Sequence, residues 1–407
     1  MSSVPPDSQQ PTPDSPLPSA LCPPVPRTAV ALSLAAMALG LSRFGYSVLL
    51  PAMRGDLDWT YTQAGGMNTA NAVGYLVGSL TATLAIAALG ERRVFSASFA
   101  LVAVSMLASG LTESYLTLLL LRTVAGVAGA TLFIAGGTLV ARLAAIAPAP
   151  GLVLGIYFAG VGPGILVSAL LAPVVLGSTG QWPLGWLTMG GLAAGSAFVA
   201  AWASRSIEPA VVPTQSEPAH LGQLGWAIAA FTLYGLGYIS YMTFIVAYQR
   251  DLGRDVAQVT LFWAVLALAA TASGWVWTSL LDRARGGVAF AVLLGILTIG
   301  AALPLLSIGT AALLCSAVLF GGSFLSVSAA MTALVRRALP SHQWALGLAA
   351  AMTLFALGQI VGPVVTGALA DRTGSLEAGL AASVLLLALA ALAATRQREA
   401  TPLNVTS

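Results

Sequence analysis

Long apolar runs dominate the chain and recur at nearly regular intervals. Each is about as long as the ~18–20 residues that an α-helix needs to cross the hydrocarbon core of a bilayer. We expect helices because an open chain in lipid would leave backbone N–H and C=O groups unpaired. The pattern therefore predicts an all-α membrane protein with twelve spans, at 28–52, 62–89, 93–111, 114–141, 151–176, 184–203, 223–248, 257–281, 287–307, 309–335, 345–370 and 376–395.

The longest internal polar stretch separates the first six predicted spans from the last six. We predict two six-helix bundles, at 27–203 and 223–395, which are joined by a cytoplasmic linker at 204–222. Residues 1–26 are rich in Pro and Ser and have no apolar core, so they are predicted to form a disordered cytoplasmic tail. Residues 396–407 are predicted to form a second cytoplasmic tail.

The two predicted bundles repeat each other at an offset of 195 residues. The matched pairs are Gly40/Gly235, Leu41/Leu236, Tyr46/Tyr241, Asp56/Asp251, Leu57/Leu252, Gln63/Gln258 and Arg142/Arg337. A six-plus-six repeat is typical of transporters whose two bundles rock about a site near the midplane. At the same offset Arg43 pairs with Tyr238, which predicts a site that is charged on one side and aromatic on the other.

Composition excludes several other classes of protein. Of the 407 residues 57% are hydrophobic and only 8% are charged, whereas soluble domains carry about 25% charged residues. The basic residues are all arginines and form no patch, so we expect no nucleic-acid partner. Two cysteines and two histidines predict neither a disulfide framework nor a metal site. Without a recognisable catalytic or cofactor motif, we expect neither an enzyme nor a bound cofactor.

The arginines also predict the orientation of the chain. With the N-terminus inside, eleven arginines fall on the cytoplasmic side of the predicted spans and four on the opposite side. The positive-inside rule therefore predicts that both termini are cytoplasmic.

Two arginines lie deep inside predicted spans that contain no acidic partner. Arg43 is in the first span, and Arg122 lies at a comparable depth in the fourth. A charge at a helix centre costs roughly 2.5–3.5 kcal/mol, so an embedded arginine is a functional candidate. Guanidinium groups bind carboxylates and phosphates bidentately, which favours an anionic ligand. The alternative is that each arginine is a strut that bonds helix carbonyls or stacks on aromatic rings.

Polar and aromatic stripes supply the other candidate binding residues. Two asparagines and a tyrosine share one face of the second span, and three tyrosines share one face of the seventh. The alternative for the asparagines is hydrogen bonding between helices, and the alternative for the tyrosines is core packing. The complete predicted substrate-binding set is Arg43, Tyr46, Asn68, Asn71, Tyr75, Arg122, Tyr238, Tyr241 and Gln359.

Four motifs resemble those of the major facilitator superfamily, over about residues 28–395. They are Arg122-x-x-x-Gly126, Gly162-Pro163, Asp282-Arg283 and Gly362-Pro363. The resemblance implies a twelve-helix transporter fold, with gating roles for Arg92, Arg93, Asp282, Arg283, Gly162, Pro163, Gly362 and Pro363. The first-half gating loop departs from the family pattern, because Ala87 stands where an aspartate is expected. The segment from Ser42 to Tyr46 further resembles the YbfB/YjiJ-type branch.

These observations predict a secondary active transporter that moves a small solute, in our interpretation a small organic anion, across a bacterial inner membrane by alternating access. The alternative is a broad-specificity exporter of hydrophobic or drug-like compounds, which the aromatic stripe would suit. No carboxylate lies deep in a span, so any ion coupling is expected to run through the charge of the substrate, through anion exchange, or through Arg122 and bound water. We expect a monomer in the lipid bilayer.

Overall fold

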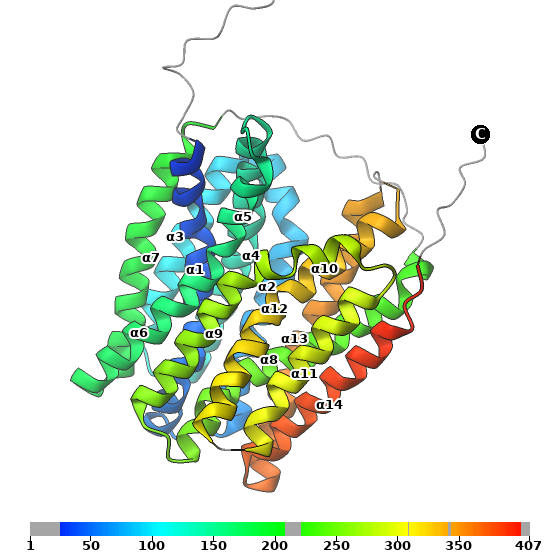
Figure 1. Ribbon diagram of the computed structural model, residues 1–407. Coiled ribbons are helices and arrows are strands. Elements are labelled where there is room, and N and C mark those ends of the chain that lie inside the picture. The colour runs from blue at the N-terminus through cyan, green and yellow to red at the C-terminus, as the bar shows by residue number, and fades with distance from the viewer. Residues whose placement is uncertain (1–24, 208–220, 308, 341–342, 400–407) are drawn as a thin grey trace, which may run out of the picture.

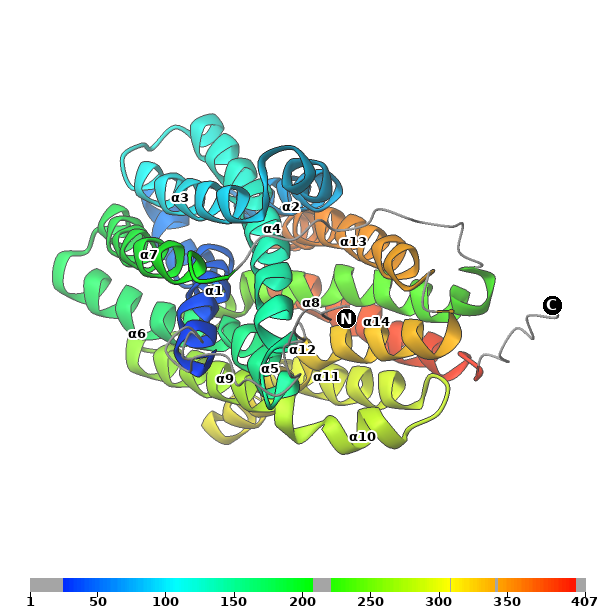
Figure 2. The ribbon, with the colours of Figure 1, turned by 90° about the horizontal axis from the view of Figure 1, so that it is seen from above.

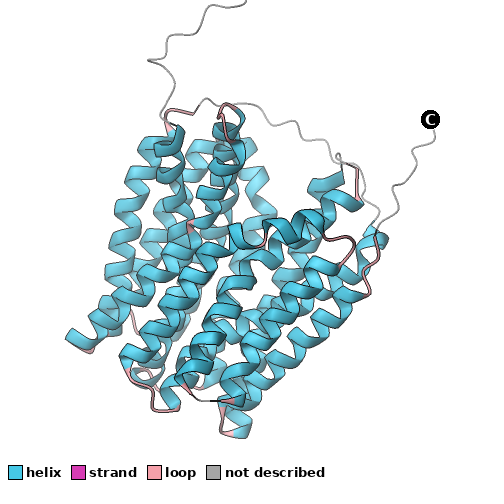
Figure 3. Cartoon of the chain, viewed as in Figure 1, coloured by secondary structure: helices cyan, strands magenta, loops and turns pink. Residues whose placement is uncertain are grey.

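The regular elements of the protein are helices. The computed structural model describes residues 25–207, 221–307, 309–340 and 343–399, and within these ranges it contains no strand (Figure 3). The helices are α1 (Val25–Asp56), α2 (Tyr61–Leu89), α3 (Glu91–Ser109), α4 (Tyr115–Ala145), α5 (Pro150–Ala159), α6 (Val161–Thr179), α7 (Trp182–Ser204), the 3₁₀ helix η1 (Leu221–Leu224), α8 (Gly225–Asp251), α9 (Val256–Val276), α10 (Thr278–Arg283), α11 (Val288–Leu306), α12 (Thr310–Ala338), α13 (Trp344–Thr373) and α14 (Leu376–Thr395).

Twelve segments in the described part of the chain are long and apolar enough to cross a membrane. This confirms the predicted all-α fold of twelve spans, and the predicted boundaries agree with the observed helices to within a few residues. Most of both predicted tails and most of the predicted linker lie outside the described residues.

Two of the spans are interrupted. The fifth consists of α5 and α6, which meet at Gly160. Pro163 has no N–H to donate to the carbonyl of Ala159, where α5 ends, so the proline accounts for the break. By contrast, α13 continues unbroken through Pro363, so the equivalent prolines of the two halves differ in their effect. The eighth span is interrupted at Trp277, and α10 follows α9 in a new direction (Figure 1).

The internal repeat has a structural counterpart at the start of the second span of each half. Thr60 caps α2, and the Gln63 side chain bonds back to the Thr60 backbone. Asp255 and Gln258 form the same capping box at the start of α9. Each box satisfies two N–H groups that would otherwise lack a partner. The matched glutamines of the repeat are therefore explained by helix capping.

The two halves meet mainly toward one end of the molecule. We call the end where α1 begins the terminal end, and the opposite end the far end. In Figure 1 the N-terminal half (α1–α7) and the C-terminal half (α8–α14) lie together at the far end and diverge toward the terminal end, and Figure 2 shows the two halves from the terminal end. Across the halves, α2 packs against α13, α6 against α9, and α1 against α8.

A helix cap supplied by the opposite half closes the far end. Asp371, near the end of α13, accepts hydrogen bonds from the backbone N–H groups of Tyr61 and Thr62, both at 2.8 Å, and from the Thr62 hydroxyl at 2.5 Å. The Tyr61 hydroxyl donates to Asp251 at the end of α8. The first N–H groups of a helix lack partners and carry the positive end of its dipole, so a carboxylate is stabilising there. We call these four residues the far-end seal.

Two glycines allow α2 and α13 to approach each other beside the far-end seal. A Cβ atom at Gly65 would collide with the carbonyl of Pro363, and one at Gly367 would collide with the carbonyl of Tyr61. Small residues permit this kind of close helix contact within a membrane. The Gly-Pro segment of α13 thus packs directly against the other half.

We expect Asp371→Ala to loosen the far end. Loss of an N-cap carboxylate costs about 0.5–2 kcal/mol, and here that energy holds two halves together. Spin labels at the exposed positions Glu113 and Arg372, introduced by cysteine substitution after replacement of Cys22 and Cys315, would report the separation of the halves by pulsed electron resonance. The variant should populate a longer distance that is rare in the parent protein.

The matched control is Glu377→Gln, which alters a carboxylate that interacts with Tyr248 within the same half. Its distance distribution should equal that of the parent. If Asp371→Ala also leaves the distribution unchanged, the cap does not stabilise the closed far end.

Candidate substrate-binding site

Arg43 is a buried cation with unused hydrogen-bonding capacity. The residue is 8% exposed and lies on α1, the helix that packs against α8 of the other half. Its guanidinium carbon lies 5.0 Å from the centre of the Tyr75 ring. Nε is buried without a partner, and the guanidinium makes no hydrogen bond to any described residue. A buried donor left unsatisfied costs about 1–3 kcal/mol, and more when it is charged. Arg43 is therefore able to bind a ligand with donors that the protein leaves free.

Arg122, in contrast, is held by the protein. Its Nη1 donates to the Ser42 carbonyl at 2.6 Å, and its Nη2 donates to Oδ1 of Asn68 at 3.2 Å. The guanidinium carbon also lies 5.2 Å from the Tyr46 ring centre and 5.5 Å from that of Trp186. Bonds to a helix carbonyl and contacts with aromatic rings are the features of a strut. In this conformation the geometry of Arg122 matches the structural alternative.

The two arginines lie at the same level of the bundle. Arg122 bonds to the residue that precedes Arg43, as their comparable depths in the sequence predict. The two cations interact unfavourably, because like charges repel strongly where the dielectric is low. No described carboxylate forms an ion pair with either arginine, and the ion pair that is present joins Arg142 to Glu91 at the terminal end. An anion at Arg43 would relieve this repulsion.

The two asparagines of α2 connect helices. Asn68 Nδ2 donates to the Thr243 hydroxyl of α8 at 2.7 Å, and Asn71 Nδ2 donates to the backbone carbonyl of Arg122 at 3.1 Å. Because Asn68 also accepts from Arg122, a continuous chain of hydrogen bonds runs from α4 through α2 to the other half. Both asparagines thus have the geometry of interhelical bonding, the alternative considered from the sequence.

An aromatic row lies in the C-terminal half. The Tyr238 ring stacks on Phe355 with 5.7 Å between centroids and 9° between planes, and on Phe324 with 6.3 Å and 18°. The Tyr238 hydroxyl donates to Oε1 of Gln359 at 3.2 Å. Gln359 is buried, and its Nε2 has no partner among the described residues. A second unused donor therefore lies beside the aromatic row.

One ring contact and one electrostatic interaction relate this row to Arg43. Phe44, the next residue on α1, meets Phe324 edge to face across the halves, with 6.0 Å between centroids. Arg43 also interacts electrostatically with Tyr238, its mate in the sequence repeat. The repeat mates Arg43 and Tyr238 thus place a charged side chain on one half and an aromatic side chain on the other. We define the central site as Arg43, Tyr75, Tyr238, Phe324, Phe355 and Gln359.

The other two tyrosines of the predicted binding set are struts inside their own halves. The Tyr46 hydroxyl donates to the Ala64 carbonyl at 2.7 Å. The Tyr241 hydroxyl shares a hydrogen bond with the Ser316 hydroxyl at 2.7 Å, and its ring stacks on Phe320. Both tyrosines are fully buried. These repeat mates therefore hold equivalent structural places and lie outside the central site.

The charged residues of the predicted gates lie at the terminal end. These gating residues are Arg92, Arg93, Asp282 and Arg283. None of the four forms a hydrogen bond or an ion pair with a described residue of the other half. The repeat mates Arg142 and Arg337 instead fix the terminal-end loops within each half. Arg142 pairs with Glu91 at 2.9 Å, and Arg337 donates to the Ala284 carbonyl at 2.5 Å. The terminal-end gate is therefore unlatched in this conformation.

The two predicted gating glycines have different neighbours. A Cβ atom at Gly162 would collide with the Thr271 side chain on α9, which belongs to the other half. A Cβ atom at Gly362 would meet the Leu236 carbonyl of α8, within the same half. Only Gly162 therefore lies directly at a contact between halves.

Several residues of the site were not identified from the sequence. Phe355 lies four residues before Gln359 and hence on the same helix face, so the helical period could have identified it. Phe324 and Thr243 had no comparable signal, because their contacts depend on how α12 and α8 dock against the other half. The same holds for Asp371 in the far-end seal, which the sequence placed only at a span end.

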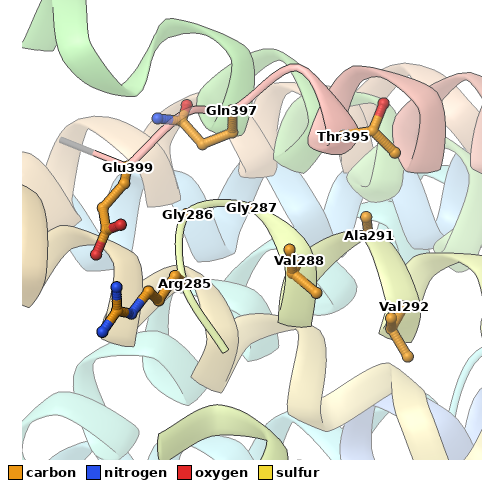
Figure 4. A pocket seen from close by; sticks show the side chains of 9 residues that line it. All are labelled: Arg285, Gly286, Gly287, Val288, Ala291, Val292, Thr395, Gln397 and Glu399. Carbon is orange, nitrogen blue, oxygen red and sulfur yellow. The ribbon is translucent and has the colours of Figure 1, made fainter. Parts of the chain in front are cut away.

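Two cavities lie away from the central site. One of about 420 Å³ at the terminal end is lined by residues of α11, of α14 and of the chain around them (Figure 4). Another of about 490 Å³ lies toward the far end, where α1 and α6 face α8 and α9, and Arg54, Arg250 and Asp251 contribute to its lining. Neither includes a residue of the central site.

Comparison with known proteins identifies the fold. A family model described as "Uncharacterised MFS-type transporter YbfB" matches residues 35–395. No curated protein matches the chain. The solved structures that resemble it include a bacterial homologue of the human lysosomal transporter Spinster in an inward-facing, unoccupied conformation, with a TM-score of 0.68 and 16% identity over 91% of this chain and 96% of the other.

Two further structures share the architecture. The nucleoside transporter NupG has a TM-score of 0.70 and 12% identity, over 92% of this chain and 98% of the other. The human organic anion transporter MFSD10 has a TM-score of 0.64 and 16% identity, over 91% of this chain and 100% of the other. At such identities the likeness concerns the fold alone, and it confirms the predicted transporter fold.

We expect the two embedded arginines to differ in their effect on stability. Arg122→Gln removes charge-assisted hydrogen bonds, each of which contributes about 1.5–3 kcal/mol, so the melting temperature should fall. Arg43→Gln removes a cation that has no hydrogen bond and is repelled by its neighbour, so the melting temperature should stay constant or rise. Tryptophan fluorescence of each protein, heated in one detergent without added organic anions, measures both effects.

Arg205→Gln, at an exposed arginine of the terminal end, provides the control for loss of a positive charge. Equal destabilisation by Arg43→Gln and Arg122→Gln would mean that Arg43 is also a strut.

Proposed function

Since the chain belongs to the YbfB-type family of major facilitator superfamily transporters, we propose that it carries a small organic anion and binds that anion at Arg43. The observation that carries the proposal is a buried guanidinium with neither a hydrogen bond nor a carboxylate partner among the described residues. A carboxylate would accept two parallel hydrogen bonds from such a group. MFSD10, a human organic anion transporter, offers a precedent on the same fold.

Alternating access is the mechanism proposed for this carrier. The hydrogen bonds between the halves in the described residues join residues 60–69, from the far end to the level of Arg122, to α8 and α13. In this conformation the far end is thus closed and the terminal end is unlatched. Release of the far-end seal, together with approach of the halves at the terminal end, would present Arg43 to the opposite side. The carrier would then need no movement of the binding residues along the membrane normal.

The proposed location is the inner membrane of a bacterium, with both termini in the cytoplasm. Eleven arginines at the terminal end, against four at the far end, support this orientation. The far end then faces outward, and the described conformation corresponds to an inward-facing carrier.

Export of hydrophobic or drug-like compounds is a second candidate, which the aromatic row favours. Such an exporter would bind its substrate against the aromatic rings and would not require the charge of Arg43. Dependence of transport on the Arg43 charge therefore separates the two functions, and cationic cargo is disfavoured by two embedded arginines.

We expect Arg43→Gln to abolish transport of an organic anion. Removing one partner of a buried, hydrogen-bonded charge pair costs about 2–5 kcal/mol, so uptake should fall at least about 30-fold. Proteoliposomes would be assayed with labelled acetate, lactate, succinate and benzoate, and with choline and uridine, after subtraction of uptake by protein-free liposomes. At least one anion should be transported, and choline should not.

Arg205→Gln again serves as the control and should retain the rate of the parent protein. Transport of an anion by Arg43→Gln at the rate of the parent would refute Arg43 as the anion site. Transport of uridine or choline alone would refute anion transport as the function.

We also expect Gly162→Leu to slow transport more than it impairs folding. The added side chain would force α6 away from Thr271 of α9, and thereby hinder the movement of one half against the other. Gly155→Leu, in open space on the same span, is the matched control. Uptake rates would be compared at equal amounts of folded protein, measured by gel filtration. A variant with the full rate would show that this contact does not limit the movement.

A further inference from the structure

We infer that the transported anion is an aromatic monocarboxylate. This inference rests on the proposed function and specifies the substrate of the same central site. It depends on three properties of that site: the number of free cationic donors, the shape of the apolar surface beside them, and a second neutral donor on the opposite half.

The free donors at the central site match one anionic group. Of the two arginines embedded deep in the described spans, Arg43 makes no hydrogen bond to any described residue, whereas Arg122 leaves only its Nε without a partner. Both terminal nitrogens of Arg122 are occupied, one by the Ser42 carbonyl and the other by Asn68. A second carboxylate on the substrate would enter the buried site without a free cation. An uncompensated buried charge is strongly unfavourable, so the site selects a monoanion over a dianion.

The aromatic rings of the C-terminal half of the site form a stack of nearly parallel planes. The rings of Phe355 and Phe324 lie within 9° and 18° of parallel to the Tyr238 ring. Tyr234 stacks on both Tyr238 and Phe355, and Phe231 stacks on Phe355. Phe355 is partly exposed, so the row is not closed at that ring. Aromatic pairs in offset-stacked or edge-to-face geometry gain about 2- to 12-fold in affinity beyond the burial of their area. A planar ring therefore fits this surface better than an aliphatic body of equal size.

Tyr75 provides a ring on the N-terminal half. It is partly exposed, and its ring already faces the Arg43 guanidinium. The cation–π contact orients the planar fork of Arg43. An anion bound to the fork would then meet rings contributed by both halves.

The second donor is Nε2 of Gln359. This nitrogen is buried without a partner among the described residues, while Oε1 of the same amide accepts from Tyr238. With its oxygen fixed in this way, the amide presents a donor, so it favours an acceptor on the ligand. A carboxylate has two oxygens and up to four lone-pair sites. One carboxylate can therefore accept from Arg43 of one half and from Gln359 of the other.

Isothermal titration calorimetry on the purified full-length protein tests the inference with four matched compounds. Benzoate carries one carboxylate on a ring, cyclohexanecarboxylate lacks the aromatic face, terephthalate adds a second charge, and benzamide removes the charge. Benzoate should bind most tightly. Cyclohexanecarboxylate should bind about 2- to 12-fold more weakly, and terephthalate and benzamide at least about 10-fold more weakly.

A variant of the aromatic row isolates the contribution of the ring. Phe355→Leu keeps an apolar side chain and removes the stacking face, so the preference for benzoate over cyclohexanecarboxylate should disappear. Phe158→Leu is the control, because Phe158 is an exposed ring of α5 that lies outside the central site. The ligand series on the unaltered protein remains decisive if Phe355→Leu does not fold.

The outcomes separate this inference from the proposed function. If cyclohexanecarboxylate or terephthalate binds as tightly as benzoate, and Arg43→Gln abolishes that binding, anion binding at Arg43 stands and the aromatic monocarboxylate is wrong. If none of the carboxylates binds, or if their binding survives Arg43→Gln, both proposals fail. Benzoate selectivity that is lost in Arg43→Gln supports both.

Discussion

A positive charge without a negative partner, held in the interior of a membrane protein, is the constraint from which the rest follows. Arg43 and Arg122 are chemically identical and lie at one level of the bundle, yet the protein treats them differently. The terminal nitrogens of Arg122 donate hydrogen bonds to a helix carbonyl and to an asparagine. The charge of Arg122 is therefore compensated within the fold. Arg43 has only the face of the Tyr75 ring. In the proposed function, the stability lost at Arg43 is recovered when an anion binds.

The internal repeat separates structural residues from site residues. Two of the pairs that match across the offset have equivalent structural roles: Gln63 and Gln258 close capping boxes, and Tyr46 and Tyr241 are buried struts. Where the repeat breaks, at Arg43 and Tyr238, the two halves contribute different chemistry to the proposed site. Residues that match across the repeat maintain two similar bundles, whereas an asymmetric ligand requires different side chains on the two sides of its site. Divergence within the repeat is thus an indicator of function that a single sequence supplies.

The sequence predicted the twelve spans because the bilayer imposes a length and an apolarity that a single chain displays directly. It also identified Arg43, since an embedded charge is conspicuous in an apolar run. It left two interpretations open for Arg122, and the choice depended on whether the Ser42 carbonyl and Asn68 lay within reach. The distances from the Arg122 guanidinium to these two groups depend on how α1, α2 and α4 pack together. Phe324 and Asp371 were missed for a related reason: ordinary residues gain their roles only from the docking of one half on the other.

The proposed function also accounts for a carrier without a carboxylate deep in its described spans. Asp251 and Asp371 lie at the far end and hold Tyr61 and Thr62 of the other half. Their charges stabilise the closed far end, while the positive charge of Arg43 lies at the centre of the bundle. When both ends close around an empty site, Arg43 loses water and gains nothing in return. When an anion is bound, its carboxylate replaces that water and lowers the repulsion from Arg122, so closure costs less. In the proposed mechanism the substrate itself is the counter-charge that permits the movement, which would favour passage of the loaded carrier over the empty one.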